Sequence, residues 1–352
     1  RVAAMGRVGI RLTAALAGAL GTLALPGLAA GVTNCTVGTT PADPTPTMVV
    51  SHESGSGTVL LRVVRVQGSA SPVIVVSDGG AAVACTGSST AAAAARFLPF
   101  FHARGTAGLV SEEPRAFSQG VVSEGVSPQI KMLVRQDGGT LSGVVLRDTD
   151  GSAERMNLGF IPGATNLALL DVNPEVDPAD PDIGIDGGVS GPLTIEGGPG
   201  ADVVVASGDS TRLPPYTRPL ILIGGEGPDS LTGGAGNDVI RPGGGADAGD
   251  ASGGFYRADY SDPPSGVDVD RTRAGAQAGG AAGDTLAGFE DLTGSPASDV
   301  LRGDTAANAL DGAGADDVIE GRGGNDLLPG GPGADVTSYA AATAPVTADA
   351  AL

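Results

Sequence analysis

Residues 224–241 read GGEGPDSLTGGAGNDVIR, which is two consecutive copies of one nine-residue pattern. The same pattern stands at 197–205 (GGPGADVVV) and at 330–338 (GGPGADVTS). These copies place glycine at positions 1, 2 and 4, aspartate at position 6 and in most cases an apolar residue at position 8. Windows 242–250 and 321–329 are close variants. A period of nine residues predicts short chain units that stack on one another, because one such unit cannot bury an apolar face by itself.

The spacing of two kinds of side chain is stricter than that of the glycines. Position 6 carries an oxygen-bearing residue at a regular interval of nine, at Asp229, Asp238 and Asp247, and again at Asp299, Asn308, Asp317, Asp326 and Asp335. Asp202 lies 27 residues before Asp229, a separation of three periods. The apolar position keeps the same interval at Val204, Leu213, Leu222, Leu231 and Ile240, and then at Leu301, Leu310, Ile319 and Leu328. Windows 294–302, 303–311 and 312–320 keep this spacing with fewer glycines.

The pattern has a direct physical interpretation. Glycine permits the positive φ of a tight turn, and the aspartate then places a carboxylate at the end of that turn. Stacked strands lie about 4.8 Å apart, and calcium bonds oxygen at about 2.3–2.6 Å. An ion between two stacked turns therefore reaches oxygens on both sides. Mg²⁺ fits less well, because it retains its waters and requires a strict octahedron.

The distribution of charge supports a cation site in this half of the chain. The 352 residues carry a net charge of −20. Residues 1–175 hold 12 acidic and 12 basic side chains, so the remaining 28 acidic and 8 basic side chains all lie in residues 176–352. This balance argues against nucleic acid as a partner. Because the aspartates repel one another and aromatic residues are few, we expect this half to fold when calcium binds.

The N-terminus has the pattern of a secretory signal over residues 1–30. Arg1, Arg7 and Arg11 precede an apolar run that ends in small residues. A single membrane anchor is the alternative, which Pro26 and several glycines weaken; after removal of a signal we expect no membrane span. Export would favour a disulfide between the two cysteines, Cys35 and Cys85, with two free thiols as the alternative.

The region 31–186 has strand-like runs separated by turns, and we interpret it as an irregular β-rich region of unknown type. Residues 91–118 contain five alanines before a Phe-rich stretch, which indicates a short helix or a poorly ordered insert. The acidic, proline-containing stretch 171–186 indicates a linker or a loose turn. The region 187–352 is expected to be the repeat region, with arrays 197–250 and 294–338 separated by a spacer at 251–293.

The motif GGxGxDxUx, in which U is apolar, resembles the RTX or haemolysin-type calcium-binding nonapeptide repeat. The resemblance implies an all-β protein with a parallel β-roll (a β-solenoid), in which successive nonamers lie on opposite sides. It implies Ca²⁺ held by the position-6 residues Asp202, Asp229, Asp238, Asp247, Asp299, Asn308, Asp317, Asp326 and Asp335. It adds backbone carbonyls of the loop residues Gly225, Gly227, Gly234, Gly236, Gly243, Gly245, Gly312, Gly314, Gly321, Gly323, Gly331 and Gly333.

Residues 18 apart should then form columns along the roll. Asp229 pairs with Asp247, while Asp299, Asp317 and Asp335 form one column and Asn308 with Asp326 forms another. Leu220 stands 18 residues before Asp238, where the family pattern has a carboxylate partner. Ala313 replaces the second glycine of the nonamer 312–320. The site of Asp238 and the loop of 312–320 therefore depart from the family pattern. The segment 251–293 is similar to the spacers that join such arrays. Residues 339–352 resemble the start of a second, truncated spacer.

Two functions remain open at this level. The first is an exported, extracellular, non-enzymatic calcium-binding protein that acts as a surface or structural module. The second is an RTX-bearing extracellular hydrolase whose catalytic part lies unrecognised in 31–186 or is missing. The sequence contains neither HExxH nor GxSxG, which lowers the second option without removing it. No catalytic residue is assigned.

Overall fold

The computed structural model describes the backbone of residues 32–40, 43–54, 56–64, 73–78, 81–83, 85–87, 98–103, 106–112, 132–136, 140–147, 155–160, 167–172, 183–186, 191–208, 214–262, 265–342 and 347. Side chains are described at 143–147, 155–159, 185 and from 191 onward over the same ranges. The predicted signal at 1–30 and most of the expected second spacer lie outside these residues.

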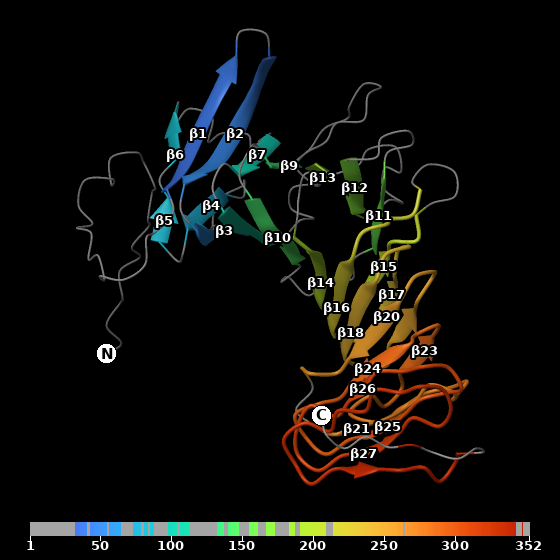
Figure 1. Cartoon of the computed structure of the whole chain (residues 1–352). Helices are drawn as coiled ribbons and strands as arrows, with labels where there is room; N and C mark the ends of the chain where they lie inside the picture. Colours follow the sequence, from blue (N-terminus) through green and yellow to red (C-terminus); the bar gives the residue numbers. More distant parts are fainter. Residues whose placement is uncertain are drawn as a thin grey trace, which may run out of the picture.

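The described residues form β-strands and no helix, which confirms the all-β prediction. Two large sheets face each other along the molecule (Figure 1). The first sheet contains, in spatial order, β23 (Thr285–Ala287), β19 (Ala248–Asp250), β17 (Ser230–Thr232), β15 (Val203–Val205), β11 (Arg155–Phe160), β12 (Leu167–Val172), β13 (Ile183–Asp186), β9 (Met132–Gln136), β7 (Leu98–Ala103), β2 (Asp43–Ser54), β1 (Val32–Thr40) and β6 (Cys85–Gly87).

The second sheet contains β26 (Leu310–Asp311), β24 (Asp291–Thr293), β20 (Tyr256–Asp259), β18 (Asp238–Gly244), β16 (Leu220–Glu226), β14 (Leu193–Pro199), β10 (Thr140–Arg147), β8 (Thr106–Glu112), β3 (Ser56–Val64), β4 (Val73–Asp78) and β5 (Ala81–Val83). A third, smaller sheet contains β22 (Ala278–Gly279), β21 (Val267–Asp270), β25 (Val300–Arg302), β27 (Val318–Glu320) and β28 (Val336–Thr337). No helix that could cross a bilayer occurs in the described part of the chain.

The chain of the repeat region alternates between faces, as a β-roll requires. It passes from β14 in the second sheet to β15 in the first, and then back and forth through β16, β17, β18 and β19. Neighbouring strands of this region pair in parallel, as in β16 with β18 and β17 with β19, except for the antiparallel pair of β21 with β22 in the spacer. The third sheet, which begins with β21 and β22 of the spacer, takes the place of the first sheet opposite β24 and β26 (Figure 1).

A ladder of single apolar side chains forms the core of the roll. On the second sheet Leu146, Ile195, Leu222, Ile240, Ala258, Leu292 and Leu310 are successive register partners, and all are fully buried. Val204 and Leu231 on the first sheet, and Leu301 and Ile319 on the third, face them from the other side. The position-8 prediction is confirmed at these residues, while Leu213 lies outside the described residues. Each coil therefore buries only one or two large side chains.

An aromatic residue of the spacer fills the space left in this ladder by a glycine. Gly249 stands where the first sheet needs an apolar side chain. The ring of Phe289, from the spacer, covers this glycine and lies 3.0 Å from the position that a Cβ atom on Gly249 would occupy. Phe289 is buried and packs edge-to-face against Tyr256, with ring centroids 6.4 Å apart. An aromatic pair of this geometry adds to the stability gained from area burial alone.

Both large sheets contain strands from each side of the boundary that the sequence led us to expect at residue 187. β10 pairs in parallel with β14, and β11 pairs in parallel with β15. The strand-like runs of 31–186 thus extend the same two faces, with antiparallel hairpins such as β11–β12 inserted between them.

Three local expectations differ from the structure. Within the stretch 91–118 the described residues 98–103 and 106–112 form the strands β7 and β8, because their β-branched and aromatic residues fit a sheet; the five alanines lie outside the described residues. The expected linker 171–186 ends in β13, which pairs with β9 and β12.

The third difference concerns the interval of 27 residues between Asp202 and Asp229. Three alternating nonamers would place the two aspartates on opposite sides, yet β15 pairs directly with β17. The interval is therefore one enlarged coil. Residues 215–220 act as the turn of that coil, because the carbonyls of Tyr216 and Arg218 lie directly beneath Gly234 and Gly236. Residues 206–214 are additional to a regular coil, and Pro214 at the end of this insertion lacks the N–H group that a ladder needs.

Candidate calcium site

The first array carries a column of buried aspartates along one edge of the roll. Each uses Oδ1 to accept a hydrogen bond from the backbone N–H of the aspartate one coil earlier. Asp229 accepts from Asp202 at 2.8 Å, Asp247 accepts from Asp229 at 2.8 Å, and Asp284 accepts from Asp247 at 3.0 Å. All four residues are buried. The expected pairing of Asp229 with Asp247 is therefore present in the structure.

The second array repeats this arrangement in front of the third sheet. Asp317 Oδ1 accepts the N–H of Asp299 at 2.8 Å, and Asp335 Oδ1 accepts the N–H of Asp317 at 3.1 Å. Asp299 in turn accepts the N–H of Val267, at 2.7 Å. The structure brings these three aspartates together in the column that the 18-residue spacing predicted.

The opposite edge, in front of the second sheet, carries a mixed set at position 6. Asp238 accepts the N–H of Leu220 at 2.9 Å, and Asp326 accepts the N–H of Asn308 at 3.0 Å. Tyr256 and Glu290 occupy the two places between these pairs, where the N–H of Tyr256 donates to Glu290 Oε2 at 2.7 Å. The aspartate column is thus interrupted on this edge.

The glycine at position 1 is explained by the place of the aspartate carboxylate in the same nonamer. The Oδ2 atoms of Asp229, Asp317 and Asp335 lie over Gly224, Gly312 and Gly330, so near that a Cβ atom there would collide with them. At these three positions a larger residue would displace the carboxylate, so the aspartate of the same nonamer favours glycine there. In the nonamer of Asp247 position 1 is Pro242 instead.

The residues at positions 2 and 4 are constrained by the backbone of the neighbouring coil that precedes them. A Cβ atom at Gly225 would meet the carbonyl oxygen of Gly198, and one at Gly227 would meet that of Gly200. Their φ angles are +113° and +119°, which also favour glycine. Ala313, Ala315 and Arg322 take positions of this kind with φ of +72°, +67° and +69°. The departure at Ala313 therefore leaves the turn intact at the expense of backbone strain.

Three carboxylate oxygens in these turns are buried without a hydrogen-bond partner: Oδ2 of Asp229, Asp247 and Asp317. Burial raises the pKa of Asp229 and of Asp317 to about 6, and that of Asp247 to about 7. The neighbouring carboxylates add to the rise at Asp247 and Asp317. A buried, ionised oxygen without a partner is unfavourable, and a bound cation removes the penalty.

The donor set fits calcium when backbone oxygens are counted. Among the described residues no cluster of three or more His, Cys, Asp or Glu side chains forms a metal site. Calcium, however, accepts backbone carbonyls together with carboxylates. The carbonyls of Gly225 and Gly227 in one turn stack on Gly243 and Gly245 of the next, beside Asp229 and Asp247. These are loop residues that the resemblance implied.

The sequence did not identify the spacer residue that ends the first column. Asp284 lies 37 residues after Asp247, outside the nine-residue interval. Its Oδ2 accepts a hydrogen bond from the Tyr260 hydroxyl at 3.0 Å, and both side chains are buried. The available signal was the sequence Gly283-Asp284-Thr285-Leu286, which resembles the second half of a nonamer.

The two cysteines meet in the strand register. β1 pairs in parallel with β6, and Cys35 is the direct register partner of Cys85. Their side chains lie outside the part of the structure in which side chains are described, so the disulfide stays a prediction.

Comparison with protein families gives one match. The family described as RTX calcium-binding nonapeptide repeat (4 copies) matches residues 221–248 and, in two overlapping matches, 293–328 and 302–336. The search of curated proteins finds no match to the chain. The matched segments are those in which the glycine turns stack and the aspartates form columns. Residues 221–336 therefore carry the calcium-binding nonapeptide repeats of the RTX family.

Proposed function

We propose that this chain is an exported calcium-binding protein whose repeats bind Ca²⁺ between stacked turns and fold on binding. One observation carries the proposal. Inside the family-matched segments, the Oδ2 atoms of Asp229, Asp247 and Asp317 are buried beside glycine turns and have no hydrogen-bond partner. Calcium would supply the missing positive charge, and Asp229, Asp247 and Asp317 would hold it together with backbone carbonyls.

Folding on binding is supported by the thin core. The coils bury single apolar side chains in register, such as Leu222 with Ile240, while each also buries a carboxylate. In the absence of a cation the repulsion and desolvation of these carboxylates oppose a small hydrophobic gain. Because the assembled turns do not exist in the unfolded chain, the binding free energy becomes folding free energy.

Export is supported by two features. Residues 1–30 have the charged and apolar pattern of a secretory signal, and RTX repeat proteins are typically exported. Extracellular calcium sites have dissociation constants of about 10⁻⁴–10⁻³ M. A protein of this design would stay unfolded inside the cell and fold outside, where it would serve as a surface or structural module.

Circular dichroism of the full chain during a Ca²⁺ titration, with Mg²⁺ as the control, tests the proposal. We expect a cooperative gain of β signal between about 0.1 and 1 mM Ca²⁺ and none with Mg²⁺. Isothermal titration calorimetry on the same sample should give saturable calcium binding. A chain that shows its full β signal in chelator would contradict folding on binding, and a chain that binds no calcium would contradict the function itself.

A further inference from the structure

The turns of the roll are of two kinds, which differ in the backbone at position 2. Six nonamers have a positive φ there, and their position-2 residues are Gly198 (+90°), Gly225 (+113°), Gly243 (+96°), Ala313 (+72°), Arg322 (+69°) and Gly331 (+90°). We name these the open turns. In the nonamers 233–241, 294–302 and 303–311 the position-2 residue lacks a positive φ. We name these three the closed turns.

The closed turns satisfy their position-6 side chain internally. The N–H of Gly234 donates to Asp238 Oδ2 at 2.8 Å, that of Ser295 to Asp299 Oδ2 at 2.5 Å, and that of Asp304 to Asn308 Oδ1 at 2.9 Å. In each case the donor is the position-2 residue of the same nonamer. The oxygen that would face an ion is therefore already used.

Three of the open turns, those of Asp229, Asp247 and Asp317, leave that oxygen without a hydrogen-bond partner. A positive φ at Gly225, Gly243 or Ala313 directs the position-2 N–H away from the carboxylate of its own nonamer. Oδ2 of Asp229, Asp247 and Asp317 is consequently without a hydrogen bond, although these residues are only 3%, 2% and 1% exposed. A positive φ at position 2 thus accompanies the free, buried carboxylate oxygen in these three turns, and the closed turns have neither.

Further groups fill the closed turns. The Tyr256 hydroxyl donates to the carbonyl oxygen of Gly234, and its ring lies against Gly233 in the turn of Asp238. The Asn308 amide donates to the carbonyl oxygen of Glu290 at 3.1 Å. The Ser295 hydroxyl donates to Asp299 Oδ1 at 2.8 Å. In each case a protein group donates a hydrogen bond to an oxygen atom of the turn, where a bound ion would otherwise be coordinated by that oxygen.

One open turn carries its own cation. Arg322 stands at position 2 of the nonamer 321–329, and its guanidinium donates to the carbonyl oxygen of Gly303 at 2.8 Å. This is a carbonyl of the preceding turn on the edge that Asn308 and Asp326 share. A fixed positive charge therefore lies against the preceding turn on this edge, at the carbonyl oxygen of Gly303.

On the basis of the calcium binding proposed above, we infer that calcium enters the open turns of Asp229, Asp247 and Asp317, whereas the closed turns of Asp238, Asp299 and Asn308 are locked by protein hydrogen bonds and take none. Calcium then binds along one edge of the roll, because these three aspartates all precede strands of the first or third sheet. The opposite edge is held by Tyr256, Asn308 and Arg322 instead.

A matched pair of substitutions in one array tests the inference. In the full chain, Asp247→Asn removes a carboxylate from an open turn, and Asp238→Asn removes one from the adjacent closed turn. Equilibrium dialysis with radioactive calcium should give fewer bound ions for D247N than for the unsubstituted chain, and an unchanged number for D238N. An equal loss in both variants, or no loss in D247N, would overturn the inference while calcium binding itself stood. A chain that binds no calcium before substitution would instead overturn the proposed function.

A second measurement does not depend on how the variants fold. Crystals of the unsubstituted chain grown with Tb³⁺ should give anomalous scattering peaks beside Asp229, Asp247 and Asp317. The turns of Asp238, Asp299 and Asn308 should give none. A peak in any of those three closed turns would contradict the assignment.

Discussion

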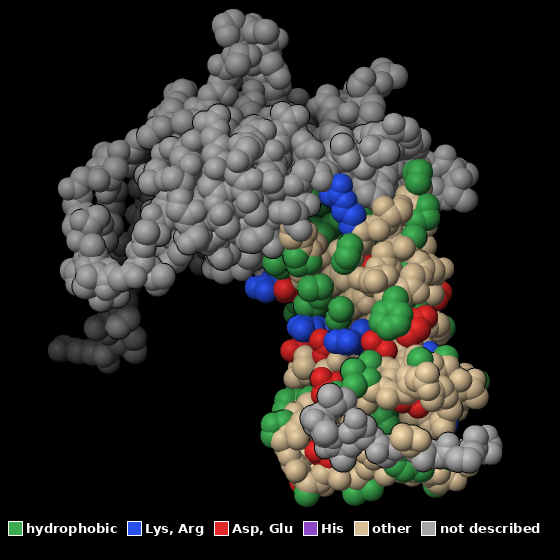
Figure 2. All heavy atoms as spheres, viewed as in Figure 1, with side chains coloured by type: hydrophobic (Ala, Val, Ile, Leu, Met, Phe, Trp, Pro, Cys, Tyr) green, Lys and Arg blue, Asp and Glu red, His purple; other side chains and the backbone are tan. Residues whose placement is uncertain are grey.

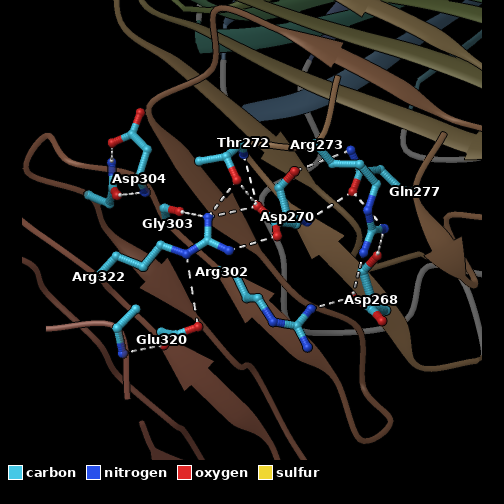
Figure 3. Close-up of polar contacts among 12 residues, drawn as sticks. Asp268, Asp270, Thr272, Arg273, Gln277, Arg302, Gly303, Asp304, Glu320 and Arg322 are labelled. Atoms are coloured by element: carbon cyan, nitrogen blue, oxygen red, sulfur yellow. Dashed lines mark hydrogen bonds and ion pairs between the residues drawn. The ribbon is translucent and has the colours of Figure 1, made fainter. Parts of the chain in front are cut away.

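The guanidinium of Arg322 forms a bidentate ion pair with Asp270, 52 residues earlier in the chain: Nη1 lies 2.8 Å from Oδ1 and Nη2 lies 2.7 Å from Oδ2 (Figure 3). The pair joins the end of β21 in the spacer to a turn of the second array. Arg302 reaches Asp268 of the same strand at 2.6 Å, and Arg271 reaches Asp304 at 3.1 Å. Protein cations thus tie the spacer to the second array.

The Arg322 pair should contribute measurably to stability. In Arg322→Ala we expect the free energy of unfolding to fall by about 2 kcal/mol, because charged hydrogen bonds to a mostly buried partner are lost. Arg322→Lys should recover only part of this, since lysine cannot form the bidentate contact. Chemical denaturation in saturating calcium would measure both.

Arg257→Ala provides the control for that substitution. Arg257 makes a single contact with Asp291, at 3.4 Å, and its side chain is 45% exposed, whereas the carboxylate of Asp291 is 5% exposed and also accepts the N–H of Ala309 at 2.8 Å. Figure 2 shows blue and red side chains next to each other on the second sheet, where pairs of this kind lie. We expect a change within about 0.5 kcal/mol for R257A, because the arginine is largely exposed and its contact is long. A loss as large as that of R322A would mean that the short bidentate contact of Arg322 is not what matters.

The calcium-free protein should gain stability as the pH falls from 8 to 5. Burial raises the folded-state pKa of Asp229 and Asp317 to about 6 and that of Asp247 to about 7, above the value of about 3.9 in an unfolded chain. A raised carboxyl pKa contributes stability that is fully present below the unfolded value and is lost as the pH rises through the folded value. The β signal in circular dichroism, recorded in chelator at pH 5 and at pH 8, would measure this as a larger folded fraction at pH 5.

Two controls accompany the pH series. The pKa of Asp270 is shifted in the opposite direction. Burial opposes its ionisation, but the hydrogen bonds from Arg322 and Thr272 outweigh burial and hold its pKa well below the usual range. Its contribution should therefore be lost only as the pH falls below about 4. Calcium affinity should weaken between pH 7 and pH 5, since protons compete for the same carboxylates. A larger β signal at pH 8 than at pH 5 in chelator would contradict the burial argument.

The two alanines with left-handed backbone should be improved by glycine. Ala313→Gly and Ala315→Gly each relieve the strain of a positive φ in a residue with a Cβ atom, and we expect each to stabilise the roll by about 1 kcal/mol. Ala307→Gly is the matched control, because Ala307 is exposed and has no positive φ. It should destabilise slightly. Equal effects at all three positions in denaturant titrations would rule out the strain argument.

A methyl group between stacked turns should disrupt the first array. In Gly227→Ala the new Cβ would collide with the carbonyl oxygen of Gly200, and φ at this residue is +119°. We expect a loss of about 3 kcal/mol and weaker calcium binding. Gly275→Ala introduces the same group in the spacer, where no atom lies within 4 Å of the Cβ position. If G275A were as destabilising as G227A, turn stacking would not be the cause.

The parallel register of β1 and β6 makes a disulfide between Cys35 and Cys85 testable. If the protein is exported, we expect a linked Cys35–Cys85 peptide in a non-reducing digest of the secreted protein. Alkylation of both thiols without prior reduction would show that the cysteines are free.

The nine-residue interval predicted much of the roll without a structure. Position 8 anticipated the buried ladder that includes Leu222 and Ile240, and position 6 anticipated the columns that contain Asp229 with Asp247. This succeeds because a stacked fold repeats one local environment, so that the same residue type is required at each interval. The sequence also predicted strands in 31–186. It did not predict that these strands extend the two faces of the roll, since parallel pairs such as β10 with β14 join segments that share no motif.

By itself the sequence determined the stacked all-β architecture, the family of its repeats and the residues that line each turn. Only the tertiary structure decided which turns leave a carboxylate oxygen free. That choice depends on φ at position 2 and on side chains brought from distant coils, such as Tyr256 against Gly233 and Arg322 against Asp270. Asp229 and Asp238 occupy the same position of adjacent nonamers, and their different hydrogen bonds arise from contacts that a nine-residue window does not contain.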